Sequence, residues 1–175
     1  MNLAGPFTRI LDPASIRPDH TLAITSSDQD RAGIARFLGI LGLESLSAQF
    51  VVNRSRRGDV ELDGRLEVNL TQACVVSLVP VPQYVAEEVH RRFVPMERSA
   101  ARKRETVVEA EVEDPPDTYS GAGIDVGAVV LEHLALALEP YPRAPGVTLP
   151  DSAKTPDDDP ASPFAVLKSL GHSES

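Results

Sequence analysis

The sequence predicts an α+β domain: a mainly antiparallel sheet or partly closed β-barrel, with an N-terminal helix, a C-terminal helix and an acidic flexible C-terminal tail. Residues 60–70 alternate apolar and polar side chains with a period of two, which predicts a strand with one dry face. Residues 26–41 and 125–139 repeat apolar residues at helical spacing. The chain has 175 residues, 42% of them hydrophobic, which suits one domain with a modest core.

The chain begins with a segment that contains several prolines. Residues 1–20 hold three of them, which predicts an extended arm rather than a helix. Residues 21–146 are predicted to form the single folded domain. Its first element is a short strand at 21–25, "TLAIT", because β-branched residues favour strands.

The first helix is predicted over residues 26–41. Ser26 or Ser27 can cap it, acidic residues fill its first turn, and Gly42 can end it. Helical spacing then puts four apolar residues on one face, which is predicted to be buried. These residues are Ile34, Phe37, Leu38 and Leu41.

A β-hairpin is predicted next, from residues 46–54 through a turn at 57–59 to residues 60–70. After Leu70, apolar residues occur at both odd and even positions, so the strand is predicted to be covered on both faces, as in a closing barrel or beneath a helix. Before that point only the even positions are apolar. They are Val60, Leu62, Leu66, Val68 and Leu70.

Two more strands are predicted at 84–95 and 105–113, followed by a loop at 114–123. The second helix begins at Asp125 and ends before the prolines of "PYPRAPG". Residues 147–175 are predicted to be a flexible acidic tail with a short terminal motif, "SPFAVLKSL". The predicted buried stripe of the second helix consists of Val126, Val129, Val130, Leu134, Ala137 and Leu138.

Charge is distributed unevenly along the chain. Residues 1–110 contain 14 acidic and 14 basic residues, so the formal net charge of −9 comes from residues 111–175. No apolar run approaches the length of a membrane span, and no secretory signal is recognisable at the N-terminus. A single cysteine cannot form an internal disulfide, which fits a cytoplasmic protein.

Cys74 is the first candidate for chemistry, and it lies in the apolar stretch "TQACVVSLVPV". The sequence predicts no metal site, because the histidines are far apart and Ser77 stands where a second cysteine would be needed. An apolar setting would bury Cys74 and raise its pKa, so it is interpreted as a packing residue. His133, on the second helix, is predicted to lie at the edge of the core rather than to act as a base. No catalytic residue and no cofactor are therefore predicted.

Two clusters of basic residues are candidates for RNA binding. Residues 90–104, "HRRFVPMERSAARKR", carry a large positive excess on a neutral body, and a smaller group precedes the hairpin turn. The alternative is that these side chains only keep a strand edge and a loop soluble. The candidates are Arg91, Arg92, Arg98, Arg102, Lys103, Arg104, Arg54, Arg56 and Arg57.

Several stretches resemble the YceD family, the large ribosomal RNA subunit accumulation proteins. They are "LEVNLTQACVVSLVPV", "FVP", "IDVGAVVLEHLALALEPYPRAPG" and the terminal "SPFAVLKSL". The amino-acid sequences of the two central stretches are similar to those of the alphaproteobacterial branch. Some relatives carry two cysteine pairs, one at the position of Cys74 and one after the last helix. This chain departs from that pattern at Ser77 and lacks the second pair.

The resemblance implies a bacterial cytoplasmic factor without enzymatic activity that supports accumulation of large-subunit (23S) ribosomal RNA and ribosome assembly. We expect it to bind precursor ribosomal RNA and no membrane. The alternative is a protein-binding adaptor, in which Phe164 and Leu167 and the acidic tail contact a ribosomal protein or assembly factor. The sequence does not set the oligomeric state.

Overall fold

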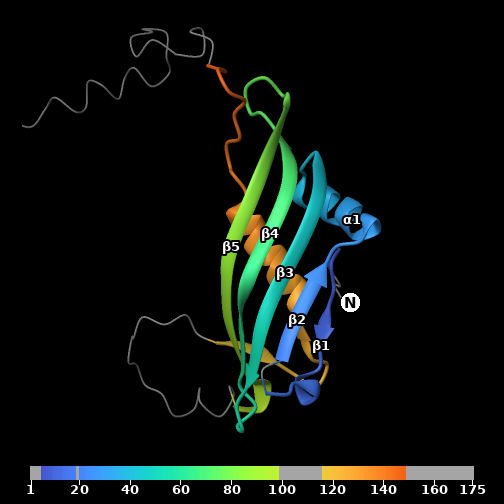
Figure 1. Ribbon diagram of the computed structural model, residues 1–175, viewed down its shortest axis with the longest axis vertical. Helices are drawn as coiled ribbons and strands as arrows, with labels where there is room; N and C mark the ends of the chain where they lie inside the picture. Colours follow the sequence, from blue (N-terminus) through green and yellow to red (C-terminus); the bar gives the residue numbers. More distant parts are fainter. Residues whose placement is uncertain (1–4, 19, 99–115, 149–175) are drawn as a thin grey trace, which may run out of the picture.

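The computed structural model describes residues 5–18, 20–98 and 116–148. These residues form two layers: a long curved sheet, and behind it a layer that holds the helices at residues 28–38 and 126–137 (Figure 1). The larger sheet comprises β2 (His20–Thr25), β3 (Gly42–Arg54), β4 (Val60–Ala73), β5 (Pro80–Pro95) and β6 (Asp117–Tyr119). The remaining elements are β1 (Ile10–Leu11), the 3-10 turn η1 (Pro13–Ser15), α1 (Asp28–Leu38), β7 (Ile124–Asp125) and α3 (Val126–Ala137).

The strand order of the larger sheet is β2-β3-β4-β5-β6, and every neighbouring pair is antiparallel except β5 and β6. β1 pairs separately with β7. The predicted α+β class with a mainly antiparallel sheet is therefore confirmed. Neither sheet closes on itself within the described residues, so the open sheet, not the barrel, is the correct alternative.

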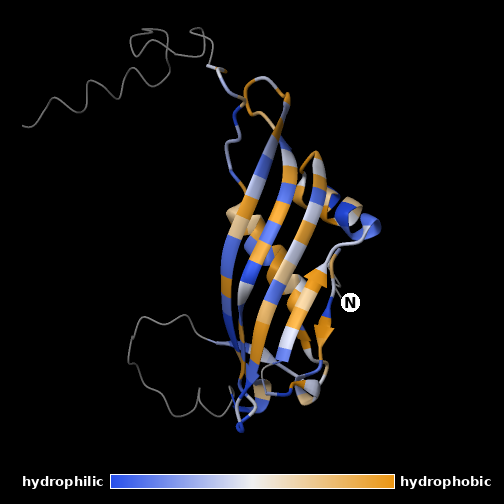
Figure 2. Cartoon of the chain, in the orientation of Figure 1, coloured by the Kyte–Doolittle hydropathy of each residue, from blue (hydrophilic) through white to orange (hydrophobic). Residues whose placement is uncertain are grey.

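The core depends on the period-two alternation of β4. All five of its predicted inward residues are at most 1% exposed, whereas Glu61, Asp63 and Arg65 between them are exposed. The same alternation is visible as bands of colour along β3, β4 and β5 in Figure 2. Each large apolar side chain buried in this way contributes about 1.5–3 kcal/mol to folding. The outer face of the sheet is consequently polar and open to solvent.

Gly64 lies at the centre of β4, directly opposite Phe50 of β3. The Phe50 ring is almost fully buried and occupies the space that a side chain at Gly64 would need. A Cβ there would lie 2.1 Å from the Gln49 carbonyl oxygen and 2.6 Å from the Phe50 ring. Only glycine therefore allows these two central strands to approach so closely.

Helix α1 begins as predicted and ends earlier than predicted. The Ser27 hydroxyl accepts a hydrogen bond from the Asp30 N–H, and the Asp30 carboxylate accepts one from the Ser27 N–H, which makes a capping box. The helix stops at Gly39, with φ +67°, whereas Gly42, the predicted stop, already begins β3. Leu41 therefore lies beyond the helix and is 56% exposed, and Phe37, although inside the helix, is 64% exposed, so their predicted burial is wrong.

Helix α3 packs across the inner face of the sheet, and its predicted buried stripe is confirmed. Val126, Val130 and Leu134 are fully covered, and Ala137 and Leu138 pack at the edge of the same core. The Asp125 carboxylate caps the helix by accepting a hydrogen bond from the Ala128 N–H. It also accepts one from the Arg9 N–H, 116 positions away in sequence.

Part of the predicted N-terminal arm belongs to this core. Phe7 is 1% exposed, and the Arg9 guanidinium stacks 4.5 Å from the centre of its ring. Arg9 also forms an ion pair of 2.6 Å with Asp30 at the start of α1. Hydrogen bonds from Ser27 and Arg9 lower the pKa of Asp30 against the opposing effect of burial. These contacts fix the segment 5–11 to both helices.

The prediction that β4 is covered on both faces beyond Leu70 is wrong. The strand ends at Ala73, and residues 74–79 form the loop to β5, where Val75 and Val79 are nearly half exposed. The strand predicted at 84–95 is present as the longer β5, and β6 lies inside the predicted loop 114–123. The strand predicted at 105–113 lies outside the described residues.

Substituting Gly64 tests this packing. We expect Gly64→Ala to lower the free energy of unfolding by about 1–3 kcal/mol, because the added methyl group must displace backbone atoms of β3. Urea unfolding followed by circular dichroism measures the change. Gly121→Ala is the matched control, since a Cβ there meets nothing within 4 Å. Equal stability of the two variants would contradict the close approach of β3 and β4.

Candidate functional site

The β3–β4 turn presents three arginines at one end of the sheet: Arg54, Arg56 and Arg57. We call these residues the turn cluster, and all three are exposed. The Ser55 hydroxyl shapes the turn by accepting hydrogen bonds from the N–H groups of Arg57 (3.2 Å) and Asp59 (3.1 Å). Within the described part of the chain, no acidic side chain forms an ion pair with the turn cluster.

The turn is held rigidly against the end of β5 and β6. Gly58 is buried with φ +89°, and a Cβ on it would lie 3.1 Å from Pro95. The Tyr119 hydroxyl donates a hydrogen bond of 2.6 Å to the Gly58 carbonyl. Arg98, just after β5, donates one to the Arg57 carbonyl (3.2 Å) and forms an ion pair with Asp59. These contacts join the positively charged turn to β6 and to the residues just after β5.

The two arginines near the end of β5 differ in their surroundings. Arg91 faces the helix layer, where it forms ion pairs with Glu132 of α3 (2.5 Å) and Asp117 of β6 (3.4 Å). Arg92 is half-buried and lies opposite Glu61 in the sheet register. The charge of Arg91 is therefore compensated locally, and Arg92 is the one of the two closer to the outer face.

The structure brings some of the predicted basic residues together and leaves others undescribed. The turn cluster and Arg98 meet at one end of the molecule, although 41 positions separate Arg57 from Arg98. Arg17 joins this end because it precedes β2, whose first residue His20 is paired with Val52. No pattern in the sequence indicated this contribution. Arg102, Lys103, Arg104, Phe164 and Leu167 lie outside the described residues.

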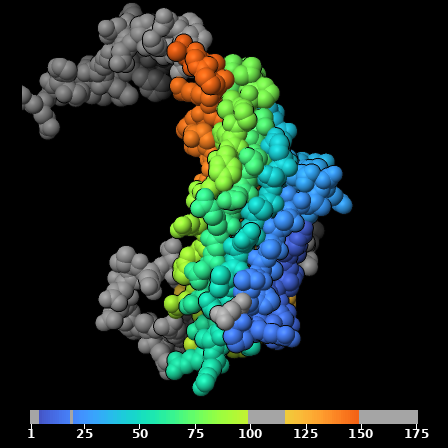
Figure 3. Space-filling view, viewed as in Figure 1, coloured from blue at the N-terminus to red at the C-terminus, as the bar shows by residue number. Residues whose placement is uncertain are grey.

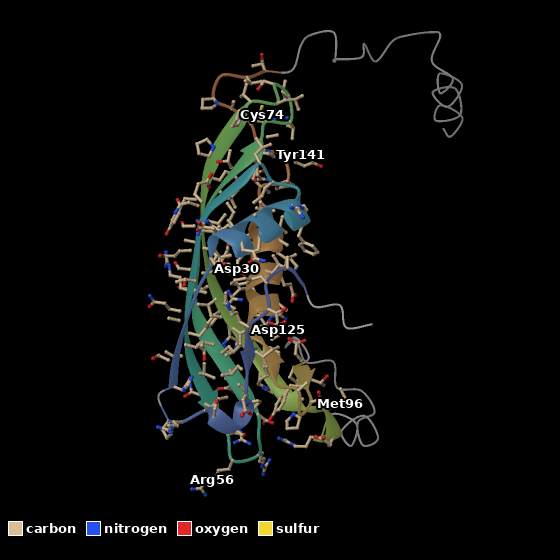
Figure 4. All side chains as sticks on the ribbon, turned by 90° about the vertical axis from the view of Figure 1, so that its right-hand side faces the viewer. Asp30, Arg56, Cys74, Met96, Asp125 and Tyr141 are labelled. Atoms are coloured by element: carbon tan, nitrogen blue, oxygen red, sulfur yellow. The ribbon has the colours of Figure 1, made fainter. Side chains whose placement is uncertain are left out.

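Cys74 lies at the opposite end of the molecule, beside the segment that follows α3 (Figure 4). Its sulfur accepts hydrogen bonds of 3.4 Å from the N–H groups of Ser77 and Ala144. The Val75 N–H donates to the Pro142 carbonyl at 2.9 Å. Cys74 therefore fastens the β4–β5 loop to the chain after α3, the two places where relatives are expected to carry cysteine pairs.

The predicted burial of Cys74 is confirmed, but the predicted direction of its pKa shift is wrong. The side chain is 0% exposed, yet it lies outside the main core. Hydrogen bonding from the Ser77 side chain, then from the Ala144 and Ser77 N–H groups, outweighs burial and lowers the pKa of Cys74 to about 6. Because this pKa is below the ordinary 9.0, the contribution of the thiolate to the stability of the fold is fully present above pH 9.0. That contribution is lost as the pH falls through about 6.

Among the described residues, no histidine forms a hydrogen bond with Cys74. His133 is half-buried on α3, and burial, followed by the charge of Arg91, lowers its pKa, so it is neutral near pH 7. His90 pairs with Asp63 on the exposed outer face, a cross-strand contact that the sequence pattern did not reveal. Among the described residues, no group of three or more His, Cys, Asp or Glu could hold a metal ion.

The surface of the two ends differs in character. The turn cluster end is hydrophilic, whereas the β4–β5 loop end is hydrophobic (Figure 2). Leu78, with φ +62°, is 75% exposed, and Tyr141 beside the loop is 70% exposed. Within the described ranges, no helix is sufficiently long and apolar to cross a membrane.

Substituting Ser77 tests the origin of the thiol's acidity. We expect Ser77→Ala to raise the pKa of Cys74 from about 6 toward its ordinary value, because the largest stabilising hydrogen bond is removed. Titration of the thiolate absorbance in the native protein measures this pKa. Ser120→Ala, a change at an exposed serine outside this loop, should leave it unchanged. A Cys74 that titrates like a free thiol in the unmodified protein would contradict the assignment.

A comparison with known families matches residues 62–171 to the family described as large ribosomal RNA subunit accumulation protein YceD. No curated protein and no solved structure matches the chain. The matched region begins inside β4, after the turn cluster, and includes β5, Cys74 and α3. Since the match covers more than half of the sequence, this chain belongs to the YceD family.

Proposed function

We propose that the protein supports the accumulation of large-subunit ribosomal RNA by binding the phosphate backbone of precursor RNA through its basic end. Membership of the YceD family supports the role in ribosomal RNA accumulation. The mode of binding is inferred from one observation. The turn cluster presents three exposed arginines without ion pairs to the described residues, on a turn that Gly58 and Tyr119 hold in place.

Uncompensated arginines are suited to this task. A guanidinium donates paired hydrogen bonds to phosphate oxygens and stays charged at every physiological pH. Arg91 and Arg98 already bind carboxylates, so we assign them a structural role that supports the turn and the end of β5. The basic residues 102–104 follow Arg98 in the sequence, and we propose that they extend the same RNA contact.

We further propose that the protein acts by binding, without catalysing a reaction, in the bacterial cytoplasm. The covered sulfur of Cys74 supports this view, because a nucleophile must reach its substrate. His90 pairs with Asp63, and the residue opposite Asp63 on the neighbouring strand β3 is Val51, which is not a nucleophile. The sequences of residues 71–81 and 134–146 resemble those of the alphaproteobacterial branch of the family, which supports placing this chain in that branch.

Charge removal at the turn tests RNA binding. We expect the triple variant R54A/R56A/R57A to bind precursor large-subunit RNA more weakly, because fewer counterions are released from the RNA. If all three arginines contact single-stranded phosphates, the slope of log K against log salt concentration should become shallower by about 2. Filter binding over a range of salt concentrations measures both quantities.

The matched control removes three positive charges elsewhere, in the variant R36A/R65A/R143A, whose arginines are exposed on α1, on β4 and after α3. Equal weakening by both variants, or an unchanged salt slope, would contradict a specific role for the turn cluster. Capture of partners from cell extract, with and without nuclease, separates the alternatives. A protein-binding adaptor acting through Phe164 and Leu167 keeps its partner after the RNA is destroyed.

A further inference from the structure

The larger sheet has two borders, and they differ in how they are protected. β5 is paired with β6 only at Phe93–Pro95, and the rest of its border carries Pro80, Pro82 and several charged residues. β2, "HTLAIT", forms the other border and contains no proline, Asp, Glu, Lys or Arg. Prolines and charges normally prevent an exposed edge strand from pairing with another strand. The β2 edge therefore lacks the protection that the β5 edge has.

The register shows which backbone groups of β2 point away from the sheet. The Ser26 N–H donates to the Leu46 carbonyl at 3.1 Å. Because hydrogen-bonded pairs alternate along an antiparallel ladder, Ile24, Leu22 and His20 bond to β3. Thr21, Ala23 and Thr25 consequently direct their N–H and C=O groups outward. Among the described residues, none of these outward groups has a backbone hydrogen-bond partner.

The space beside this edge is open. A groove of about 320 Å³ runs between β1 and β2, lined by Ile10 and Leu11 on one side and by residues 22–25 on the other. β1 pairs with β7 rather than with β2. Asp125, the register partner of Ile10, lies away from the sheet in the layer of the helices (Figure 4). β2 is the border strand of the larger sheet, and no described strand pairs with its other edge. In the space-filling view, the blue N-terminal part of the chain lies along this side of the molecule (Figure 3).

The sequence of β2 identifies the strand that fits there. Residues 21–25, Thr-Leu-Ala-Ile-Thr, have nearly the same chemistry in both directions. In an antiparallel pair of two copies centred on Ala23, threonine faces threonine, leucine faces isoleucine and alanine faces alanine. Threonine pairs and branched apolar pairs are favourable across strands, and no like charges meet.

We propose that two copies of this chain associate through their β2 edges, in antiparallel orientation about a two-fold axis at Ala23, to form one continuous sheet. Each outward N–H of one copy then donates to an outward C=O of the other, because Thr21 faces Thr25 of the second copy. β2 begins beside the end of β3 that bears the turn cluster. The dimer therefore directs its two turn clusters to opposite ends, and the pairing does not depend on RNA binding.

Crosslinking tests the register of this contact. The two-fold axis brings the Ala23 Cα atoms of both copies to about 5.5 Å, a separation that a disulfide can bridge. We expect full-length Ala23→Cys to form a covalent dimer in oxidised glutathione. Gln49→Cys is the matched control: it lies on the same face, in register with Ala23 but one strand inward. It should stay monomeric on a denaturing gel, and the native Cys74 is covered in both variants.

Sedimentation of the full chain over a range from low to several hundred micromolar tests the association itself. We expect a reversible dimer, and at least a roughly tenfold higher dissociation constant for Ala23→Pro. Proline at 23 removes only an outward N–H, which an edge strand tolerates, so the circular dichroism spectrum should be retained. A monomer at all concentrations overturns the proposal, even if an unrelated peptide binds the edge. A dimer that Ala23→Pro does not weaken, with no crosslink at Ala23→Cys, also overturns it.

Discussion

Burial of the even-numbered side chains of β4 beneath α3 is the interaction on which the rest of the structure depends. β4 is the central strand, paired along its whole length with β5 and nearly so with β3. Its inner face supplies the most completely covered residues, and α3 covers them with a helix that is apolar on most of its surface. A shift of β4 by one residue would turn every one of these side chains into solvent. The register of three strands is thus fixed by one hydrophobic pattern.

That register also determines where the functional groups lie. Because β3 and β4 are long and paired with each other along most of their length, their connecting turn projects at one end and the β4–β5 loop at the other. The arginines of the turn therefore lie far from the sulfur of Cys74, as the labels for Arg56 and Cys74 in Figure 4 show. A molecule built in this way can use its two ends for different partners. The basic end suits polyanions, and the apolar loop end, with Leu78 and Tyr141 exposed, suits a protein surface.

At Cys74, hydrogen bonds to the sulfur lower the pKa of the thiol by more than burial raises it. Its neighbours in sequence are alanine and valine, which suggested a raised pKa. The fold instead directs the Ser77 side chain and two backbone N–H groups at the sulfur, one N–H from its own loop and one from a segment 70 positions away. The thiolate accepts these bonds more strongly than the thiol does, so the balance changes sign. A sulfur in this position joins two loops where relatives are expected to have further cysteines.

The sequence by itself determined the strand hairpin, the inner face of β4, the buried stripe of α3 and the presence of excess arginines. These features are periodic or local, and burial within a single element is enough to impose them. Only the tertiary structure decided that Arg91 and Arg98 form ion pairs while the turn cluster forms none with the described residues, that residues 74–79 leave the sheet, and that Phe37 is exposed. Those outcomes depend on contacts between residues tens of positions apart, which arise only when register and layer packing bring separate elements together. Local sequence patterns do not indicate these long-range contacts.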